Sequence, residues 1–554
     1  MSQTHRAQKN ASQRHEREYV CVLCGLAGDD KIETWSTRVK RIMSKLFEQN
    51  ESPQGDEAAA RVMRVEDWES KSEEERTAHD IVAALQEEGT AYFAGGYVRD
   101  MLIEKTHGER FESKDVDIAT ELQPDEVRRI LESRGFKTDA VGASFGVVIA
   151  HKEGSREHQI EIATFRKEDR YTDGRRPDEV ILIRDAGKDA ERRDFTINAL
   201  FFDPVQRTVI DYVGGIGDVE KKILRPVGNA KERFEEDYLR MLRYVRFRNK
   251  YEFSFSQEVQ RIIQESAEHI RRISGERTRD ELDKMLTLER NYMAMNDLAR
   301  LGLLSHILPE VMQMRGIRHG KAHFHKEGDA YRHTLEALRA MSLAEYVRRM
   351  KRVMNVSHEM SDDEARRLFN ERYGTEVAWA VLVHDLGKAV TREVEPDLEW
   401  GTRVTFKSHE SESEWMAGDI GWRLKFGNDR REKVMWLVRH HMQLYEIGKM
   451  RTSTRRRLLQ HPWIEELYLL DLADQLGNFP AHAERFDELL KFLEEERARP
   501  PEPKELIDGK RLMEELDIKP GPLVGKLKRA IRDVQLEGVV KTADEAIAYA
   551  REQM

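Results

Sequence analysis

The stretch AYFAGGYVRDMLIEKTHGERFESKDVDIAT, residues 91–120, decides the fold. A short apolar run leads into a glycine pair, Gly95 and Gly96, and a helical segment then leads to a second β-type run with Asp115 and Asp117. Since alternate side chains of a strand point to the same face, this spacing directs both carboxylates to one side of a sheet. Two such carboxylates repel each other unless a divalent cation neutralises them, which predicts a Mg²⁺ site. A lone Asp-x-Asp pair is also typical of a solvated strand end.

Further short runs predict the rest of a small mixed α/β sheet. FGVVIAHK, residues 145–152, and HQIEIATF, residues 158–165, are β-type, and the second contains Glu161. Glu161 supplies a third carboxylate if its strand lies beside that of Asp117. After about residue 218 the strand signals fade and apolar residues recur at helical spacing, so we expect the remainder to be mainly α-helical.

The bulk composition narrows the class of protein. A chain of 554 residues is too long for one ordinary core, so several domains are expected. No apolar run of about 20 residues predicts a membrane span, and the first residues lack a signal-peptide core, which favours a cytoplasmic location.

The two cysteines, Cys21 and Cys24, form one CxxC, which is either half of a zinc site or a cysteine pair without a metal. The net charge of -10 argues against a nucleic-acid partner unless basic residues are concentrated locally.

The order of a Gly-Gly turn, a helix with Arg99 and then Asp115-x-Asp117 resembles the polymerase-β nucleotidyltransferase superfamily. The resemblance implies that Gly95 and Gly96 let backbone N–H groups approach a triphosphate while Arg99 adds a fixed cation. It also implies two Mg²⁺ ions at the carboxylates, which activate an RNA 3'-hydroxyl and steady the departing pyrophosphate.

Four later stretches resemble the class II tRNA nucleotidyltransferases and the related bacterial poly(A) polymerases. They are ATFRKEDRYTDGRRPDEV at 163–180, ERRDFTINALFFD at 191–203, DYVGGIGDVEKKILRPVG at 211–228 and RFEEDYLRMLRYVRF at 233–247. The resemblance runs from about residue 80 to 290. It places at the nucleotide Arg193, Asp194, Asn198, Asp237, Arg240, Arg243 and Arg246, and at the start of the neck Asp211, Gly214, Gly215 and Asp218.

The base-reading part of this expectation also has a physical basis. Asp237 and Arg240 are three apart and would share a helix face. A carboxylate accepts from the amine of cytosine or adenine and a guanidinium donates to the neighbouring ring nitrogen, whereas uracil and guanine present the opposite pattern. In isolation, the same pair is also typical of a surface salt bridge.

Two details distinguish members of this family. VGASFGVVIA, residues 141–150 with Gly142 and Gly146, stands where poly(A) polymerases carry a basic Gly-Arg-Arg-Phe type block, which favours the tRNA enzyme. A loop segment from Asp169 to Pro177 disfavours CC-only addition. An A-adding enzyme, a poly(A) polymerase, and an HD phosphohydrolase with an RNA-binding head remain as alternatives.

A second site is predicted further along. The order of His333, His384-Asp385 and Asp474 resembles the HD phosphohydrolase superfamily, which implies a divalent transition metal or Mg²⁺ that activates water. His409, His440 and His441 match the extra histidines found in many such domains. Lys388 matches the position that helps to hold a phosphate in these relatives. The resemblance implies hydrolysis of 2',3'-cyclic phosphates or phosphate monoesters, with a metal-free remnant that only binds RNA as the alternative.

Basic residues near the C-terminus resolve the conflict with the net charge. The last segment resembles the tRNA-binding tail of the same enzymes. Its basic residues are Lys510, Arg511, Lys526, Lys528, Arg529 and Arg532, and RTSTRRR adds Arg451, Arg455, Arg456 and Arg457. Contacts from such residues to phosphates recognise shape rather than sequence, although a solvated basic face has the same composition.

We therefore expect five regions. They are a flexible extension at 1–75, an α/β nucleotidyltransferase head at 76–218, a helical neck and body at 219–315, an HD domain at 316–496 and a helical, tRNA-binding tail at 497–554. The expected reaction is addition of the 3'-terminal CCA to tRNA from CTP and ATP, with a second hydrolase activity at the HD site.

Overall fold

The computed structural model describes residues 60–111, 115–139, 146–153, 159–169, 179–318, 328–397, 401–478, 483–499 and 505–554. Cys21 and Cys24, Gly142 and residues 170–177 of the predicted loop lie outside the described residues. None of the described helices is long and apolar enough to cross a membrane.

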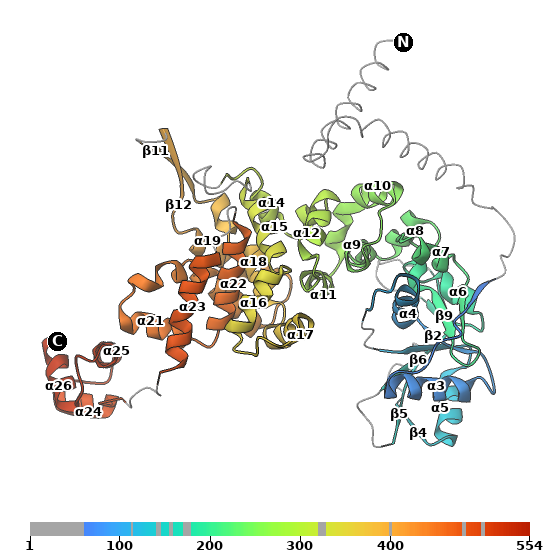
Figure 1. The fold of residues 1–554 in the computed structure, drawn as a ribbon, viewed down its shortest axis with the longest axis horizontal. Helices are drawn as coiled ribbons and strands as arrows, with labels where there is room; N and C mark the ends of the chain where they lie inside the picture. Colours follow the sequence, from blue (N-terminus) through green and yellow to red (C-terminus); the bar gives the residue numbers. More distant parts are fainter. Residues whose placement is uncertain are drawn as a thin grey trace, which may run out of the picture. The chain divides into compact units, whose positions relative to one another are not determined.

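The head is built on an eight-stranded mixed sheet, which confirms the predicted fold class (Figure 1). Its strand order is β1-β10-β9-β2-β3-β6-β5-β4. The strands are β1 Arg61–Arg64, β2 Ala91–Ala94, β3 Asp117–Thr120, β4 Phe136–Asp139, β5 Val147–Lys152, β6 Ile160–Thr164, β9 Leu200–Asp203 and β10 Thr208–Asp211. β3 and β6 pair in parallel, and the other neighbours are antiparallel. A separate hairpin joins β7 Arg166–Asp169 to β8 Glu179–Leu182.

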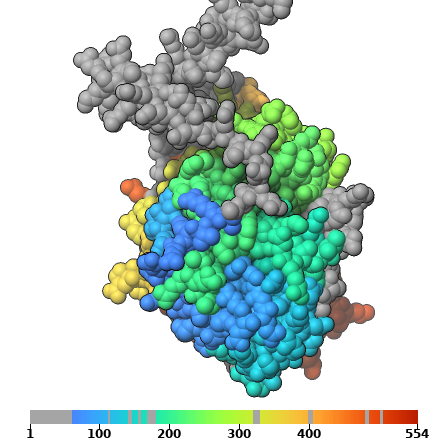
Figure 2. Space-filling model, turned by 90° about the vertical axis from the view of Figure 1, so that its right-hand side faces the viewer, coloured from blue at the N-terminus to red at the C-terminus, as the bar shows by residue number. Residues whose placement is uncertain are grey.

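The head begins earlier than expected, because residues 61–75 belong to it. β1 pairs with β10 at the sheet edge, and in Figure 2 blue atoms of the first described residues lie against green ones. Trp68 is buried, and its indole N–H donates to the Tyr97 hydroxyl at 3.0 Å. α3 Glu73–Leu85 starts at a capping box made by Ser72 and Glu75. The predicted extension therefore does not reach residue 75.

Helices surround the head sheet and make up the neck. Those of the head are α3, α4 Gly96–His107, α5 Pro124–Ser133, α6 Ala186–Glu191, η3 Thr196–Asn198 and α7 Gly215–Glu220. Those of the neck are α8 Ala230–Glu236, α9 Leu239–Tyr251, α10 Gln257–Ser266, η4 Ala267–Arg272, α11 Gly275–Leu286, α12 Asn291–Arg300, α13 Leu303–Ile307 and α14 Pro309–Gln313.

The predicted shared helix face of Asp237 and Arg240 is wrong. α8 ends at Glu236 and α9 begins at Leu239, because Asp237 adopts an extended backbone with φ −151° and ψ 104°. Asp237 and Arg240 therefore do not share one helix face. They remain neighbours, since the Arg240 N–H donates to the Asp237 carbonyl at 3.0 Å.

The next region is helical except for a hairpin of β11 Arg392–Asp397 and β12 Gly401–Phe406, which the sequence did not indicate. Its helices are α15 Ala330–Ala340, α16 Ala344–Val353, α17 Asp362–Tyr373, α18 Glu376–Val383, η5 Leu386–Ala389, α19 His409–Arg423, α20 Asn428–His440, η6 Gln443–Lys449, α21 Thr452–Leu459, α22 Ile464–Gly477 and α23 Ala483–Arg497. The tail helices α24 Gly509–Leu516, α25 Pro522–Leu536 and α26 Ala543–Glu552 share a small apolar cluster of their own.

Asp211 ties the end of the sheet to α7. Its Oδ1 accepts N–H bonds from Val213, Gly214 and Gly215 at 2.8 to 3.0 Å, and its Oδ2 accepts from Ile216 at 2.9 Å. Gly215 is required beside it, since an added Cβ would lie 2.3 Å from the Thr196 carbonyl oxygen. These residues therefore build the turn that starts the neck.

We predict that Asp211→Ala destabilises the head by about 2–3 kcal/mol, because buried N–H groups lose a charged acceptor. Thermal unfolding of the full chain should show the corresponding transition lowered by about 5–10 °C. Asp211→Asn, which keeps one oxygen acceptor, should fall between wild type and alanine. Equal midpoints for all three proteins would contradict this role.

Candidate active sites

The head brings Asp117 and Glu161 together as predicted. Ile118 pairs with Ile162 across the parallel strands β3 and β6, and both side chains are buried on one face. The acidic residues come one position earlier on each strand, so they lie on the opposite face. Gly95, at φ 71° before α4, also lies here, because a Cβ added to it would stand 3.6 Å from both Asp117 Oδ2 and Arg193 Nη1. The glycine turn therefore approaches the carboxylates closely.

The electrostatics of this face favour a cation. Burial, and next the negative charge of Glu161, raise the pKa of Asp117 to about 6. Asp115 and Glu74 add to this shift, and Arg193 opposes it. Crowded carboxylates of this kind suit Mg²⁺. Asp115, Asp117 and Glu161 nevertheless do not bring three ligand atoms within 4.8 Å of one another, as two groups of described residues do later in the chain.

The residues expected at the nucleotide form a polar network that joins the head to α9. Arg99 is buried and donates from Nη1 to Asn198 Oδ1 at 2.6 Å. Asn198 donates in turn to Asp194 Oδ1 at 2.9 Å, and Asp194 pairs with Arg243 at 2.6 Å. Burial would raise the pKa of Asp194, but Arg243 and Asn198 outweigh it and hold that pKa below its ordinary value. Arg193 pairs with Asp189 at 3.0 Å.

The residues expected to read the base are held by partners that the sequence did not indicate. Asp237 pairs with Arg277 of α11 at 2.6 Å, and Arg246 pairs with Glu281 of the same helix at 2.6 Å. Arg240 pairs with Glu236 and also donates to the Arg233 carbonyl at 2.9 Å. The spacing of four between Arg277 and Glu281 indicates one helix face, but nothing in the sequence identified the partner of that face.

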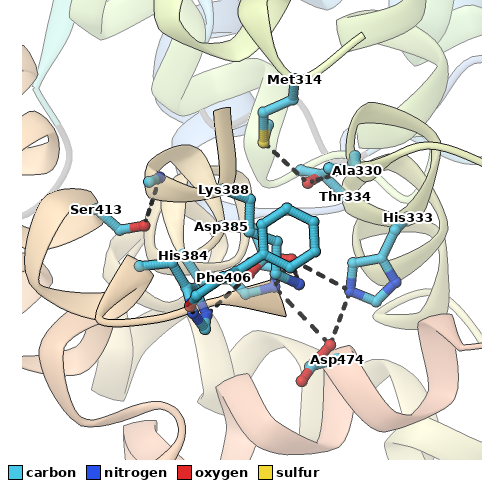
Figure 3. Close-up of polar contacts among 12 residues, drawn as sticks. Met314, Ala330, His333, Thr334, His384, Asp385, Lys388, Phe406, Ser413 and Asp474 are labelled. Atoms are coloured by element: carbon cyan, nitrogen blue, oxygen red, sulfur yellow. Dashed lines mark hydrogen bonds and ion pairs between the residues drawn. The ribbon is translucent and has the colours of Figure 1, made fainter. Parts of the chain in front are cut away.

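The second site gathers four predicted ligands from three elements (Figure 3). His333 Nε2 of α15 lies 2.8 Å from Asp474 Oδ1 of α22, and His384 Nε2 at the end of α18 lies 3.8 Å from the same oxygen. Asp385 Oδ2 lies 3.3 Å from His384 Nε2. Asp385 Oδ1 lies 3.5 Å from His409 Nε2 and 3.9 Å from His441 Nε2. The ligand atoms thus form two groups, His333–His384–Asp474 and Asp385–His409–His441, and Asp385 is also close to His384 of the first group.

His440, predicted as a possible ligand, is in neither group of described residues. Its ring stacks on Trp436 with centroids 4.4 Å apart, and its Nδ1 lies 2.7 Å from the Trp436 carbonyl oxygen. Adjacent helical residues point in directions about 100° apart, so only one of two neighbouring histidines can face the site.

The residues at this site fit bound divalent metal. His384 Nε2 and Asp385 Oδ1 are buried without a hydrogen-bond partner, although groups of this kind are costly to leave unsatisfied. Burial and then His384 lower the pKa of His441 to about 3, which keeps its imidazole in the neutral form that binds metals. Lys388 Nζ lies 2.6 Å from Asp385 Oδ2.

Two glycines allow the helices of the second site to approach one another. A Cβ at Gly387 would lie 2.2 Å from the His409 carbonyl oxygen, and one at Gly477 would lie 2.6 Å from the Ala337 nitrogen. Gly387 thus seats the start of α19 beside Asp385, and Gly477 seats α22 against α15.

The residues expected to bind tRNA differ in how their side chains are held. Arg456 is buried and pairs with Glu496 at 3.1 Å, so it holds α21 to α23 rather than lying on a solvated face. Arg457 pairs with Asp533 and Lys528 with Glu505, while Arg455 lies over the Phe492 ring and Arg529 donates to the Gly525 carbonyl. Lys526 is on α25. The basic surface is therefore smaller than the sequence suggested.

The fold and the two sites define a nucleotidyltransferase head followed by an HD domain. Residues 91–225 match the model of the poly A polymerase head domain, residues 252–314 that of the probable RNA and SrmB-binding site of polymerase A, and residues 346–478 that of the HD domain. The chain therefore carries regions that match a poly A polymerase head, its RNA-binding region and an HD domain, in the order that the sequence predicted. His333 lies outside the matched HD range, yet the fold places it in the site.

The relatives are CCA-adding enzymes. The chain is 42% identical to the CCA-adding enzyme of Lactobacillus johnsonii over 206 residues, which cover 37% of this chain and 48% of the relative. It is 38% identical to the CCA-adding enzyme of Bacillus subtilis over 217 residues, which cover 39% of this chain and 51% of the relative. The chain spans about half the length of the curated relatives it matches. The crystal structure of the Bacillus stearothermophilus CCA-adding enzyme with CTP has the same fold, with TM-score 0.59, 23% identity, and 87% and 98% of the two chains covered.

The arrangement of the histidines predicts opposite effects of two adjacent substitutions. His441→Ala should weaken Mn²⁺ binding to the HD site by about 10-fold or more, because it removes a ligand, whereas His440→Ala should leave it within about 2-fold. Isothermal titration calorimetry with a metal-stripped full chain measures both. Equal weakening by the two substitutions would contradict the assignment.

Proposed function

We propose that the chain adds the 3'-terminal CCA to tRNA from CTP and ATP without a nucleic-acid template. The observation that carries this proposal is the placing of Asp117 and Glu161 on adjacent parallel strands directly beside the Gly95 turn. The relatives, all named CCA-adding enzymes, support the tRNA substrate over poly(A) synthesis or A-only addition.

Each residue of the head has a role in this proposal. Asp115, Asp117 and Glu161 would hold two Mg²⁺ ions, which when bound neutralise the phosphates and lower the pKa of the 3'-hydroxyl. The turn at Gly95 and Gly96 brings backbone close to the triphosphate, with Arg193 beside it as a fixed cation. Beyond the head, Asp237 and Arg240 would read the donor and acceptor pattern of C and A.

We also propose that the HD domain is a metal-dependent phosphohydrolase that acts on 2',3'-cyclic phosphates or phosphate monoesters. The two neighbouring ligand groups, His333–His384–Asp474 and Asp385–His409–His441, support a centre of Mg²⁺ or a transition metal, which when bound would supply an activated water. Lys388, whose Nζ lies 2.6 Å from Asp385 Oδ2, would hold a phosphate oxygen. The exposed basic residues of the tail, Lys526 among them, would bind tRNA phosphates, and a tRNA substrate implies a cytoplasmic place of action.

The direct test uses three labelled tRNA transcripts that end before CCA, after C and after CC. With Mg²⁺, CTP and ATP, all three should grow to one product that ends in CCA. Extension of the CC-ended transcript alone would make the chain an A-adding enzyme, and long A tails on unstructured RNA would make it a poly(A) polymerase. Extension of none would leave only the phosphohydrolase.

Separate sites predict separable losses. Asp117→Ala, and likewise Asp115→Ala, should lower the rate of CCA addition by about a thousand-fold or more, because the metal ligands are lost. Hydrolysis of a 2',3'-cyclic nucleotide should stay within about 2-fold of wild type, and Asp385→Ala should show the reverse pattern. Loss of both activities in each folded variant would contradict two independent sites.

A further inference from the structure

Helix α11 contacts the base-reading residues along one face. Arg277 holds Asp237 with two hydrogen bonds, Nη2 to Oδ2 at 2.6 Å and Nη1 to Oδ1 at 3.3 Å. Glu281, one turn later and almost fully buried, holds Arg246 Nε at 2.6 Å. Asp237 lies in the extended break between α8 and α9, and its Oδ1 also accepts the backbone N–H of Leu239 at 3.0 Å. Arg277 is therefore the contact that ties the orientation of Asp237 to another helix.

The opposite face of α11 is anchored in the HD domain. Asp283 accepts both guanidinium Nη groups of Arg430, each at 2.7 Å, and the Trp379 indole N–H at 2.6 Å. Arg430 lies in the first turn of α20, and Trp379 lies in α18. A bidentate arginine and carboxylate pair of this kind is geometrically specific.

Two further contacts fix the start of α11. A Cβ at Gly275 would lie 2.3 Å from the Arg423 carbonyl oxygen, so the helix start packs directly on the backbone at the end of α19. Arg279 donates to the Lys425 carbonyl at 2.6 Å. These contacts and the Asp283 anchor span two turns of α11, so the helix is attached to the HD domain along most of its length.

A helix moves as a rigid rod over such a length, because consecutive turns are joined by backbone hydrogen bonds. Arg277 and Glu281 are four apart and share a face, whereas Asp283, two residues after Glu281, points to the other side. A rotation or shift at Asp283 is therefore passed on to the Arg277 and Asp237 pair.

We propose that α11 is a positioning element shared by the two halves of the enzyme, so that the Arg430 and Trp379 anchor on Asp283 sets the nucleotide choice made at Asp237. This inference rests on the proposed nucleotidyltransferase function. Arg430 is a positioning residue, since it acts through Asp283 and α11 and touches no base-reading residue. The HD domain thus contributes to polymerase fidelity independently of its metal ligands.

The test compares single-nucleotide incorporation of CTP and UTP on a transcript that ends before CCA. The measured quantity is the ratio of kcat/KM for the two nucleotides, which general loss of stability lowers for both alike. Arg430→Gln and the isosteric Asp283→Asn should each reduce the CTP preference by about 3- to 10-fold. Arg430→Lys, which keeps the charge but loses the bidentate geometry, should fall between wild type and Arg430→Gln.

Arg431 supplies the matched control, because it is the next residue of α20 and donates to Asn428 within its own turn. Arg431→Gln should keep the wild-type ratio of kcat/KM, and Asp237→Ala should lose most of the preference for CTP over UTP. Wild-type ratios for Arg430→Gln, Arg430→Lys and Asp283→Asn, with a lowered ratio for Asp237→Ala, would overturn the shared positioning while leaving the proposed function intact. An unchanged ratio for Asp237→Ala would overturn base reading by that residue and this inference together. Thermal unfolding identifies any variant that does not fold. If one of Arg430→Gln, Arg430→Lys and Asp283→Asn fails to fold, the CTP preference of the other two decides the test.

Discussion

The structure depends on gathering carboxylates at two places that suit a bound cation. In the head, Asp117 faces Glu161 across adjacent strands, and its raised pKa records the cost of that arrangement. In the HD domain, Asp385 and Asp474 are gathered with four histidines, and Asp385 Oδ1 is left without a hydrogen-bond donor. The free-energy cost of bringing these carboxylates together is offset when a cation binds between them. Both sites are therefore organised around positive charge that a ligand brings.

Between the two sites, arginine and carboxylate pairs connect elements that are far apart in the sequence. Arg243 of α9 holds Asp194 of the head, Arg246 holds Glu281 of α11, and Asp283 of α11 holds Arg430 of α20. Each pair is partly or largely buried, so truncating one partner would leave the other charge uncompensated. The neck thus transmits position from one domain to the next.

Several features were predictable because they follow from local periodicity. Strand alternation predicted one face for Asp115 and Asp117, with Glu161 beside them if its strand lay alongside, and the glycine pair predicted the turn at Gly95. The HD ligands His333, His384, Asp385 and Asp474 were expected because their order in the chain resembles that of a known superfamily.

Other features depend on tertiary contacts that no local pattern encodes. Strand β1 is four residues long and forms because β10 offers it an edge. The break at Asp237 interrupts apolar residues that keep helical spacing, and Asp237 pairs there with Arg277 from another helix. Packing also decides that His441 faces Asp385 while His440 stacks on Trp436. The burial of Arg456 in α21 could not be predicted either, because its acidic partner Glu496 comes from a distant segment.

The central claim is that both acidic clusters are metal centres, and it is tested most directly by anomalous diffraction. Crystals of the full chain grown with CTP and Mn²⁺ should show anomalous peaks beside Asp117 and on both sides of Asp385. Peaks at Asp385 without any at Asp117 would contradict the account of the head, and an Mn²⁺-free HD site would contradict the account of the second centre.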